Sequence, residues 1–138
     1  MPEWPATTIA VLSTIGGGPH AIPVAAPVRA GDQRILISLE RTRGSLARLR
    51  GNPHVALAIL TGGNCAFTAL GRAHIVQESM PDAANYVAVE IDVEEIDDHR
   101  SPGVVVESGV RVQFADDAKL SLRKRIDALR ELTERKTS

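Results

Sequence analysis

The chain has 138 residues, of which 43% are hydrophobic and 24% are charged, and its net charge is −1. These values are typical of one soluble globular domain that buries a core without help from a metal or a disulfide. The small net charge excludes a general attraction of the chain to nucleic acid or anionic membranes, and a single cysteine, Cys65, excludes an internal disulfide. We expect one domain over 1–138 in the cytoplasm, because the N-terminus lacks signal-peptide character and no apolar run approaches the ~20 residues of a membrane span.

The first two predicted strands form a hairpin. Residues 7–15 are rich in β-branched side chains, and the turn at 16–19 (Gly-Gly-Gly-Pro) leads into a second strand at 20–28. A glycine run can wrap a phosphate, but dinucleotide and P-loop motifs need a helix after the turn, so we reject that interpretation. Pro23 and Pro27 remove hydrogen-bond donors from one side of the second strand. That side is therefore either a sheet edge or the place of a ligand.

A third strand at 33–39 leads into a short predicted helix at 43–50. Thr42 is the expected N-cap, and the sequence Gly-Asn-Pro at 51–53 is a stop signal. The first turn of a helix offers free N–H donors and the positive end of the helix dipole.

Basic and hydroxyl side chains surround this helix start. Arg41 and Arg43 flank it, and Ser45 adds a hydroxyl. Together these groups predict a phosphate-binding site. The alternative is a connector helix whose arginines are solvated.

Three further strands are predicted after this helix. Residues 54–60 form a continuous apolar run, which indicates a strand that is central or buried on both faces. The next strand, at 65–77, contains Gly71, a candidate bulge. Residues 85–97 alternate, with Glu90, Asp92 and Glu94 on one face. Three carboxylates can hold a hard cation, but we favour a solvated face and expect no metal site.

The C-terminal part is predicted to contain a loop at 97–103, a seventh strand at 104–114 and a helix at 116–135. The loop places His99 beside two aspartates, yet no nucleophile accompanies it, so we assign no catalytic residue. The helix carries a narrow apolar stripe that can dock on the sheet or on a partner chain. Its basic run at 123–125 could contact nucleic acid, but interspersed acidic residues favour a solvated face.

The order of these elements predicts a mainly β fold with two helices, a split antiparallel barrel of six to seven strands. Residues ~6–77 also resemble the pyridoxamine 5′-phosphate oxidase-like split-barrel flavoproteins. The matching segments are Gly-Gly-Pro-His-Ala-Ile-Pro-Val at 17–24, Ile-Leu-Ile-Ser at 35–38, the helix and strand start at 42–57, and Gly-Arg-Ala at 71–73.

The resemblance implies a homodimer that binds FMN, or alternatively a deazaflavin or no cofactor, in a groove between two barrels. In that family an arginine and a lysine at the start of the helix hold the cofactor phosphate. Arg43 matches the arginine, whereas Ser45 stands in place of the lysine. A hydroxyl supplies no charge, so phosphate affinity should fall unless Arg41 or Arg48 compensates.

The resemblance places the flavin ring against the second and third strands, at Pro23, Val24, Ala25, Ser38 and Leu39. It implies an oxidoreductase that acts on a small molecule by hydride transfer, in which the flavin performs the redox chemistry. A non-catalytic protein that binds flavin, haem or another small ligand is the alternative. A nucleic-acid-binding module that uses the last helix is a third hypothesis. Trp4, His99 and Arg111 are candidates to reach the partner subunit.

Overall fold

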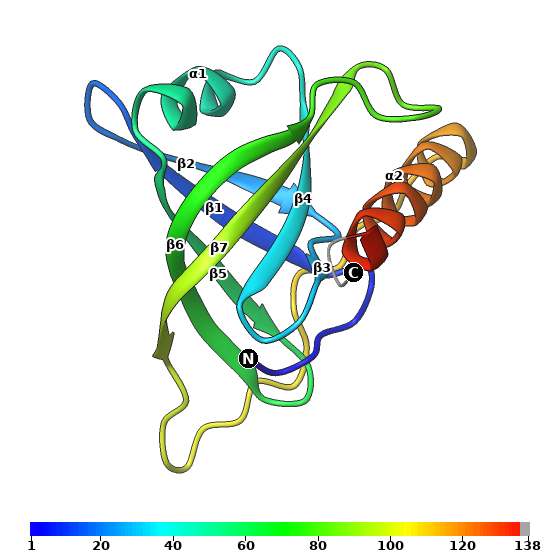
Figure 1. Cartoon of the computed structure of the whole chain (residues 1–138). Helices are drawn as coiled ribbons and strands as arrows, with labels where there is room; N and C mark the ends of the chain where they lie inside the picture. Colours follow the sequence, from blue (N-terminus) through cyan, green and yellow to red (C-terminus); the bar gives the residue numbers. More distant parts are fainter. Residues whose placement is uncertain (136–138) are drawn as a thin grey trace.

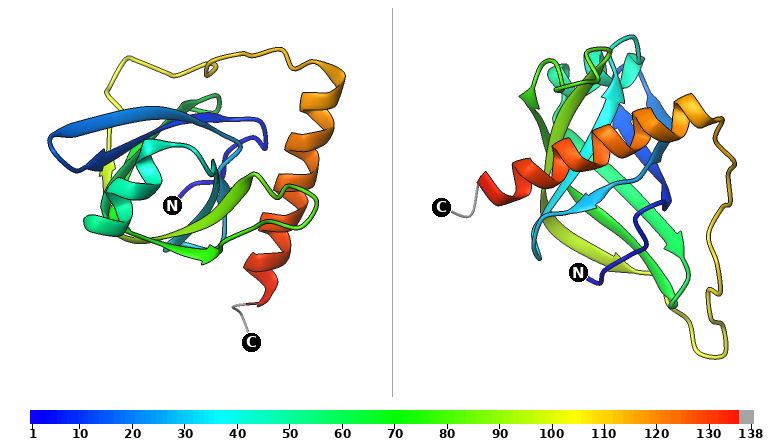
Figure 2. Two further views of the ribbon diagram at one scale, coloured as in Figure 1. Left: turned by 90° about the horizontal axis from the view of Figure 1, so that it is seen from above. Right: turned by 90° about the vertical axis from the view of Figure 1, so that its right-hand side faces the viewer.

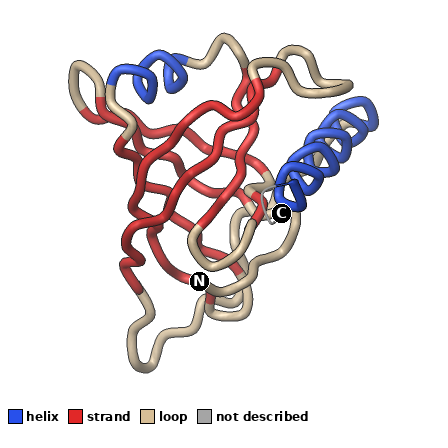
Figure 3. Tube along the Cα trace, viewed as in Figure 1, coloured by secondary structure: helices blue, strands red, loops and turns tan. Residues whose placement is uncertain are grey.

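The structure, a computed structural model, describes residues 1–135. Within these residues, seven strands form one antiparallel sheet that two helices accompany (Figures 1 and 3). In chain order the elements are β1 (Ile9–Ile15), β2 (Pro19–Ala25), β3 (Val28–Arg29), β4 (Arg34–Glu40), α1 (Gly44–Gly51), β5 (His54–Thr61), β6 (Cys65–Gln77), β7 (Tyr86–Asp98) and α2 (Asp116–Arg135). Neither described helix is long and apolar enough to cross a membrane.

The sheet curls around a single large core. Its strand order is β2-β1-β5-β6-β7-β4-β3, so β4 pairs with β7 far along the chain. Because side chains alternate along a strand, one face of each strand points inward, and these faces form one buried cluster. Leu46 and Leu49 of α1 join that cluster, so α1 packs over one end of the barrel (Figure 1). The predicted split-barrel fold is confirmed.

The second strand is divided, in contrast to the prediction of one strand at 20–28. β2 ends at Ala25, and Ala26 adopts a left-handed conformation with φ of 55°. Pro27 follows this break, and β3 then pairs with β4 instead of β1. β2 stands at the end of the strand order, so the interpretation of Pro23 as the mark of a sheet edge is confirmed, whereas Pro27 lies outside the strand.

The apolar strand β5 lies between β1 and β6, as expected of a central strand. It is buried on one face only, which corrects the alternative that both faces are covered. Val55, Leu57 and Ile59 point into the core, whereas Leu60 is 55% exposed. The outer face of the sheet at β1 and β5 is therefore apolar and open.

The predicted strand at 104–114 is wrong. Among the described residues this segment joins no strand; it runs along the outside of the barrel to the start of α2 (Figure 2). It is held by hydrogen bonds to the turn between β5 and β6: the Val106 N–H donates to Asn64 Oδ1 at 3.0 Å, and the Asn64 N–H donates to the Val106 carbonyl at 3.1 Å. The sheet still has seven strands, because β3 is a separate short strand that the sequence did not predict.

Helix α2 packs on the outer face of the sheet beside β3 and β4 (Figure 2). Leu129 is 1% exposed and lies in a second apolar cluster with Leu36 and Ala88. Leu132, also predicted for the apolar stripe, packs against the same cluster. The prediction of a helix that docks through this stripe is confirmed.

Gly71 allows β6 and β7 to approach closely where the register shifts. A Cβ atom at residue 71 would lie 2.0 Å from the carbonyl oxygen of Asp92. The register between the two strands changes at Leu70/Gly71, as expected of a bulge.

We predict that Gly71→Ala lowers the free energy of unfolding by about 3 kcal/mol, the upper end of the cost of overpacking, because its methyl group meets rigid backbone. Urea denaturation measures this change. Gly51→Ala is the control, since no atom lies within 4 Å of an added Cβ there, and we expect a change of less than about 1 kcal/mol. Equal stabilities of the two variants would contradict the proposed steric role of Gly71.

Candidate functional site

The start of α1 lies directly after β4, at the corner that the sequence singled out. Arg43 occupies the N-cap position with extended backbone, φ −69° and ψ 133°. Thr42, the expected cap, therefore stands one residue too early, and no side chain among the described residues caps the helix. The first turn of α1 carries no acidic residue, so its positive dipole end is not neutralised from within the helix.

Two polar groups in α1 are buried without partners. Ser45 is 0% exposed, and its Oγ accepts or donates no hydrogen bond within residues 1–135. The Nε of Arg48 is buried and equally unpartnered in the described chain. Ser45 and Arg48 are three residues apart and therefore neighbours on the helix. An unsatisfied buried polar group costs about 1–3 kcal/mol. Seven buried side-chain atoms lack a hydrogen-bond partner within the described residues, and two of them belong to α1.

Glycines make room for Arg48. A Cβ atom on Gly16, in the turn between β1 and β2, would lie 2.9 Å from Cγ of Arg48, and one on Gly44 would lie 2.7 Å from its terminal nitrogen. Beside this arginine an open groove of about 650 Å³ runs along one face of α1, from Gly44 to Asn52. Arg48 and a glycine surface line this groove, and their chemistry fits a phosphate, whereas Ser45 is fully buried and is not among the lining residues.

The glycine turn is the part of this site that the sequence did not predict. The order strand–turn–strand argued against phosphate binding by Gly16 and Gly17, yet both line the groove beside α1. The contact arises only because the curled sheet carries the β1–β2 turn to α1. No signal within the turn itself could have shown it.

The two arginines before α1 differ in their roles. Arg41 donates hydrogen bonds to the carbonyl oxygens of Glu78, at 2.6 Å, and Ala84, at 3.0 Å, and thereby holds the loop before β7. Arg43 is half exposed, and its Nε lies 3.9 Å from the carboxylate of Glu40. Of the two, Arg43 has the guanidinium that remains available to an anion.

The residues expected against a flavin ring do not share one surface. The side chains of Val24 and Leu39 belong to the core, so only their backbone could face a ligand. Pro23 is exposed and Ala25 is partly buried on β2. Ser38 lies on the opposite face of β4 from Leu39, beneath α2.

Arg125 of α2 explains the position of Ser38. Its guanidinium donates a hydrogen bond of 3.1 Å to Ser38 Oγ and stacks 4.0 Å above the ring of Tyr86. Arg125 is 8% exposed, so the prediction that the basic run at 123–125 is solvated is wrong for this residue, whereas Arg123 and Lys124 are exposed as expected. Burial lowers the pKa of the Arg125 guanidinium. Fewer cations of the segment 123–125 are therefore accessible to a nucleic acid than the sequence suggests.

The prediction that the acidic face of β7 is solvated is wrong for Glu90, whereas the side chains of Asp92 and Glu94 are exposed as expected. Glu90 is 1% exposed and lies 2.6 Å from Arg34 on β4 and 3.0 Å from Nε2 of His74 on β6. His74 Nδ1 is also 3.5 Å from Asp92. Ligand atoms of His74, Glu90 and Asp92 lie within 4.8 Å of one another, as in metal sites. Because Arg34 already neutralises Glu90, we interpret the group as an ion-pair network.

Two of the three residues expected to reach a partner subunit have contacts within their own chain. Trp4 donates a hydrogen bond of 2.8 Å to the Pro27 carbonyl, and its ring centroid lies 5.9 Å from that of Phe67. His99 Nε2 is 2.7 Å from Thr68 Oγ1 on β6. Beside it, hydrogen bonds from Arg100 lower the pKa of the Asp98 carboxyl to about 2.

We predict that Ser45→Ala raises the free energy of unfolding of the ligand-free protein by up to about 1 kcal/mol. The substitution removes a buried hydroxyl that has no partner and leaves the Cβ in place. Thermal and urea unfolding measure the change. A loss of stability would show that this hydroxyl is satisfied in solution and is not available to a ligand.

The sequence matches no protein-family model and no curated protein. Solved structures do resemble the fold. A candidate pyridoxamine 5′-phosphate oxidase from Listeria innocua is 18% identical, with a TM-score of 0.56 over 68% of this chain and 90% of its own. A FAD-binding protein from Mesorhizobium loti is 15% identical, with a TM-score of 0.53 over 66% and 84% of the two chains.

An F420 reductase is also similar, at 13% identity, with a TM-score of 0.55 over 67% of this chain and 91% of its own. Identities this low establish the fold and leave the activity open. This chain has the split-barrel fold of the pyridoxamine 5′-phosphate oxidase-like proteins.

Proposed function

We propose that this protein is a flavin- or deazaflavin-dependent oxidoreductase that acts on a small molecule, and that the cofactor phosphate binds at the start of α1. The unpartnered Nε of Arg48, a residue that lines the groove beside α1, carries the proposal. Native proteins rarely bury polar atoms without partners unless a ligand or water completes them. The named neighbours, a FAD-binding protein and an F420 reductase, support a flavin or deazaflavin as that ligand.

The residues of this chain have separate tasks in the proposed site. Arg48 and Arg43 supply positive charge, and the first-turn N–H groups of α1 add donors. Gly16 and Gly44 leave room for the Arg48 side chain, which packs directly against them. Arg41 holds the loop 78–84 and thereby fixes the end of β4 from which the helix starts. When bound, the flavin ring would supply the hydride chemistry.

A second function on the same site is binding without turnover. The position that carries a lysine in the resembling family is here Ser45, which has no charge and is fully buried. The described residues that line the groove beside α1 include no acid–base pair. A protein that holds a flavin or another small ligand, without oxidising a substrate, would need no more than this corner provides.

We further propose a homodimer that pairs through the open outer face of β1 and β5. Val11, Ile15 and Leu60 on this face are 43%, 51% and 55% exposed. Contiguous exposed apolar side chains are typical of protein–protein interfaces. Pairing through this face would place the two barrels on either side of a groove, as the resemblance implies.

We predict that the purified protein binds FMN or the deazaflavin F420, measured by absorbance and fluorescence titration, and binds phosphate-free riboflavin less tightly. Arg48→Ala should weaken binding of the phosphorylated cofactor about tenfold or more, the worth of one charge-assisted hydrogen bond. Arg50→Ala is the matched control, because Arg50 lies on the same helix but pairs with Glu78 at 3.1 Å.

Failure to bind either cofactor would remove the proposed function. Equal losses in the Arg48 and Arg50 variants would move the phosphate away from this corner. Cofactor binding combined with no oxidation of reduced nicotinamide or candidate substrates would favour the non-catalytic alternative.

We predict that Leu60→Glu converts the dimer to a monomer, because a carboxylate would have to be buried in an apolar interface. Size-exclusion chromatography with light scattering measures the mass. Leu120→Glu is the control, since Leu120 is 53% exposed on α2, away from this face. A wild-type monomer, or an intact Leu60→Glu dimer, would contradict pairing through β1 and β5.

A further inference from the structure

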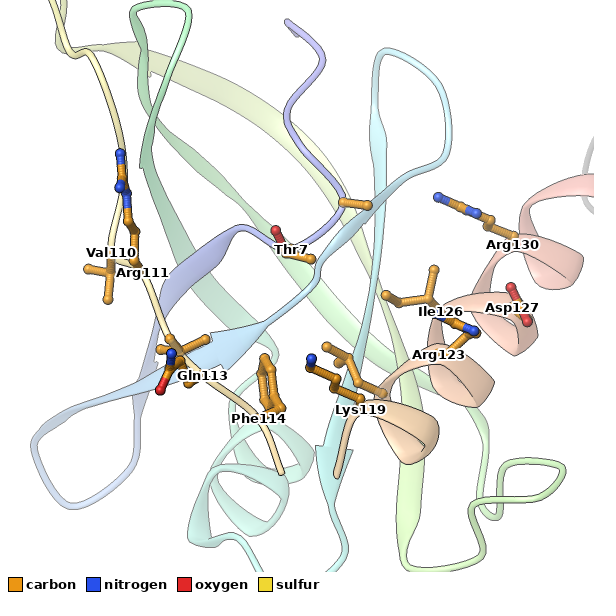
Figure 4. Close-up of a pocket in the computed structure, with 13 residues that line it drawn as sticks. Thr7, Val110, Arg111, Gln113, Phe114, Lys119, Arg123, Ile126, Asp127 and Arg130 are labelled. Atoms are coloured by element: carbon orange, nitrogen blue, oxygen red, sulfur yellow. The ribbon is translucent and has the colours of Figure 1, made fainter. Parts of the chain in front are cut away.

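A second and larger groove lies on another part of the molecule, between the extended segment before α2 and α2 itself (Figure 4). The segment 110–114 forms one wall, α2 forms the other, and Ala6 and Thr7 lie between them. The volume is about 860 Å³, within the range of small-molecule sites. None of the residues that line it lines the groove beside α1.

Apolar side chains from both walls line this groove. Val110 and Val112 of the segment are 68% and 47% exposed, although the sequence alternates there as a strand would. Phe114 follows them, and Leu122 and Ile126 line the wall formed by α2. Exposed valines on an extended segment are unfavourable in water, so an apolar ligand body would gain by covering them.

Positive charge surrounds this apolar surface. Arg111, Lys119, Arg123 and Arg130 line the groove, whereas Asp127 is its only carboxylate in the described chain. None of the four cations takes part in an ion pair within residues 1–135. The whole chain has a net charge of −1, so this positive surface is a local feature.

We propose that this groove binds an amphipathic organic anion, a carboxylate or phosphate monoester on an extended hydrocarbon or aromatic body. The unpaired cations complement the head group, and the valines and Ile126 complement the body. A nucleic acid fits less well, because its bases and backbone would leave the valines uncovered and would face Asp127. The proposal is independent of the flavin site, since the two grooves share no residue.

The chain carries its own reporter of binding. Trp4 is the single tryptophan, and it lines a smaller hollow that shares Ala6, Ile126 and Arg130 with the groove. Occupation of the groove should therefore change the tryptophan fluorescence. Isothermal titration calorimetry on the same samples gives the stoichiometry.

The probes keep one chain and vary the head group: dodecanoate, dodecyl phosphate and uncharged dodecanol, each below its aggregation concentration. We expect saturable binding of at least one of the two anions at one per chain and at least tenfold weaker binding of dodecanol, which is about 1.4 kcal/mol or more. The preferred anion identifies the head group. The proposal would be overturned if neither anion bound saturably, or if dodecanol bound as tightly as the anions.

Paired variants test the location. The double variant Lys119→Glu with Arg123→Glu should weaken anion binding about tenfold or more, whereas Lys124→Glu, an exposed residue of α2 outside the lining, should change it less than about twofold. Val112→Asp should likewise abolish binding, while Val105→Asp, 66% exposed and outside the groove, should not. Equal effects within either pair would overturn the assignment.

Three further measurements distinguish loss of the groove from unfolding and from self-association. Far-UV circular dichroism and flavin titration of each variant show whether the fold and the α1 site persist, so loss of anion binding is not confused with unfolding. Light scattering of the same variants gives their mass. If Val112→Asp but not Val105→Asp lowers this mass, and the wild-type protein binds neither anion, the groove is an interface between two copies and the proposal is wrong.

Discussion

The close approach of β6 to β7 at Gly71 is the constraint on which the rest of the structure depends. Only a residue without a side chain allows the backbone of β6 to lie against the carbonyl of Asp92, and the register shifts at this point. The resulting bend lets both strands, 13 residues each, follow a curved path instead of a flat one. The β1–β2 turn and α1, which are separated along the chain, meet at one end of the curled sheet, and Arg48 lies between them.

Buried charges fasten the outer face of this sheet. Glu90 on β7 pairs with Arg34 on β4 and His74 on β6, so three strands share one carboxylate. Arg125 fastens α2 to the same face through its hydrogen bond to Ser38 and its stacking on Tyr86. Breaking a buried pair costs more than its formation contributes, so such contacts specify the arrangement of strands and helix more than they add stability.

The sequence predicted most of the fold because the relevant signals are local. Alternation, turn glycines and the Gly-Asn-Pro stop located the main strands and α1 from neighbouring residues. Apart from the helix cap and the break at Ala26, the errors are tertiary in origin. Residues 104–114 have the pattern of a strand, yet no edge in the described chain receives them; Glu90 and Arg125 have polar side chains, yet the fold buries them. At the candidate site, the sequence placed Arg43, Ser45 and Arg48 on or beside one helix, and their role stays a prediction. The glycine turn beside them cannot be recognised before the chain is folded.

The polar groups at α1 are buried, whereas those of the groove at α2 are exposed. This difference in burial affects the kind of ligand that each groove would favour. At α1 the polar atoms of Ser45 and Arg48 are buried and unsatisfied, which lowers the stability of the empty protein and favours a ligand that makes defined hydrogen bonds. At α2 the cations are exposed and hydrated, and the uncovered groups are valines. Binding there would gain mainly from apolar contact, with charge selecting the head group. The proposed α1 site would recognise one phosphate geometry, whereas the proposed α2 site would accept a class of molecules that share a charge and an apolar body.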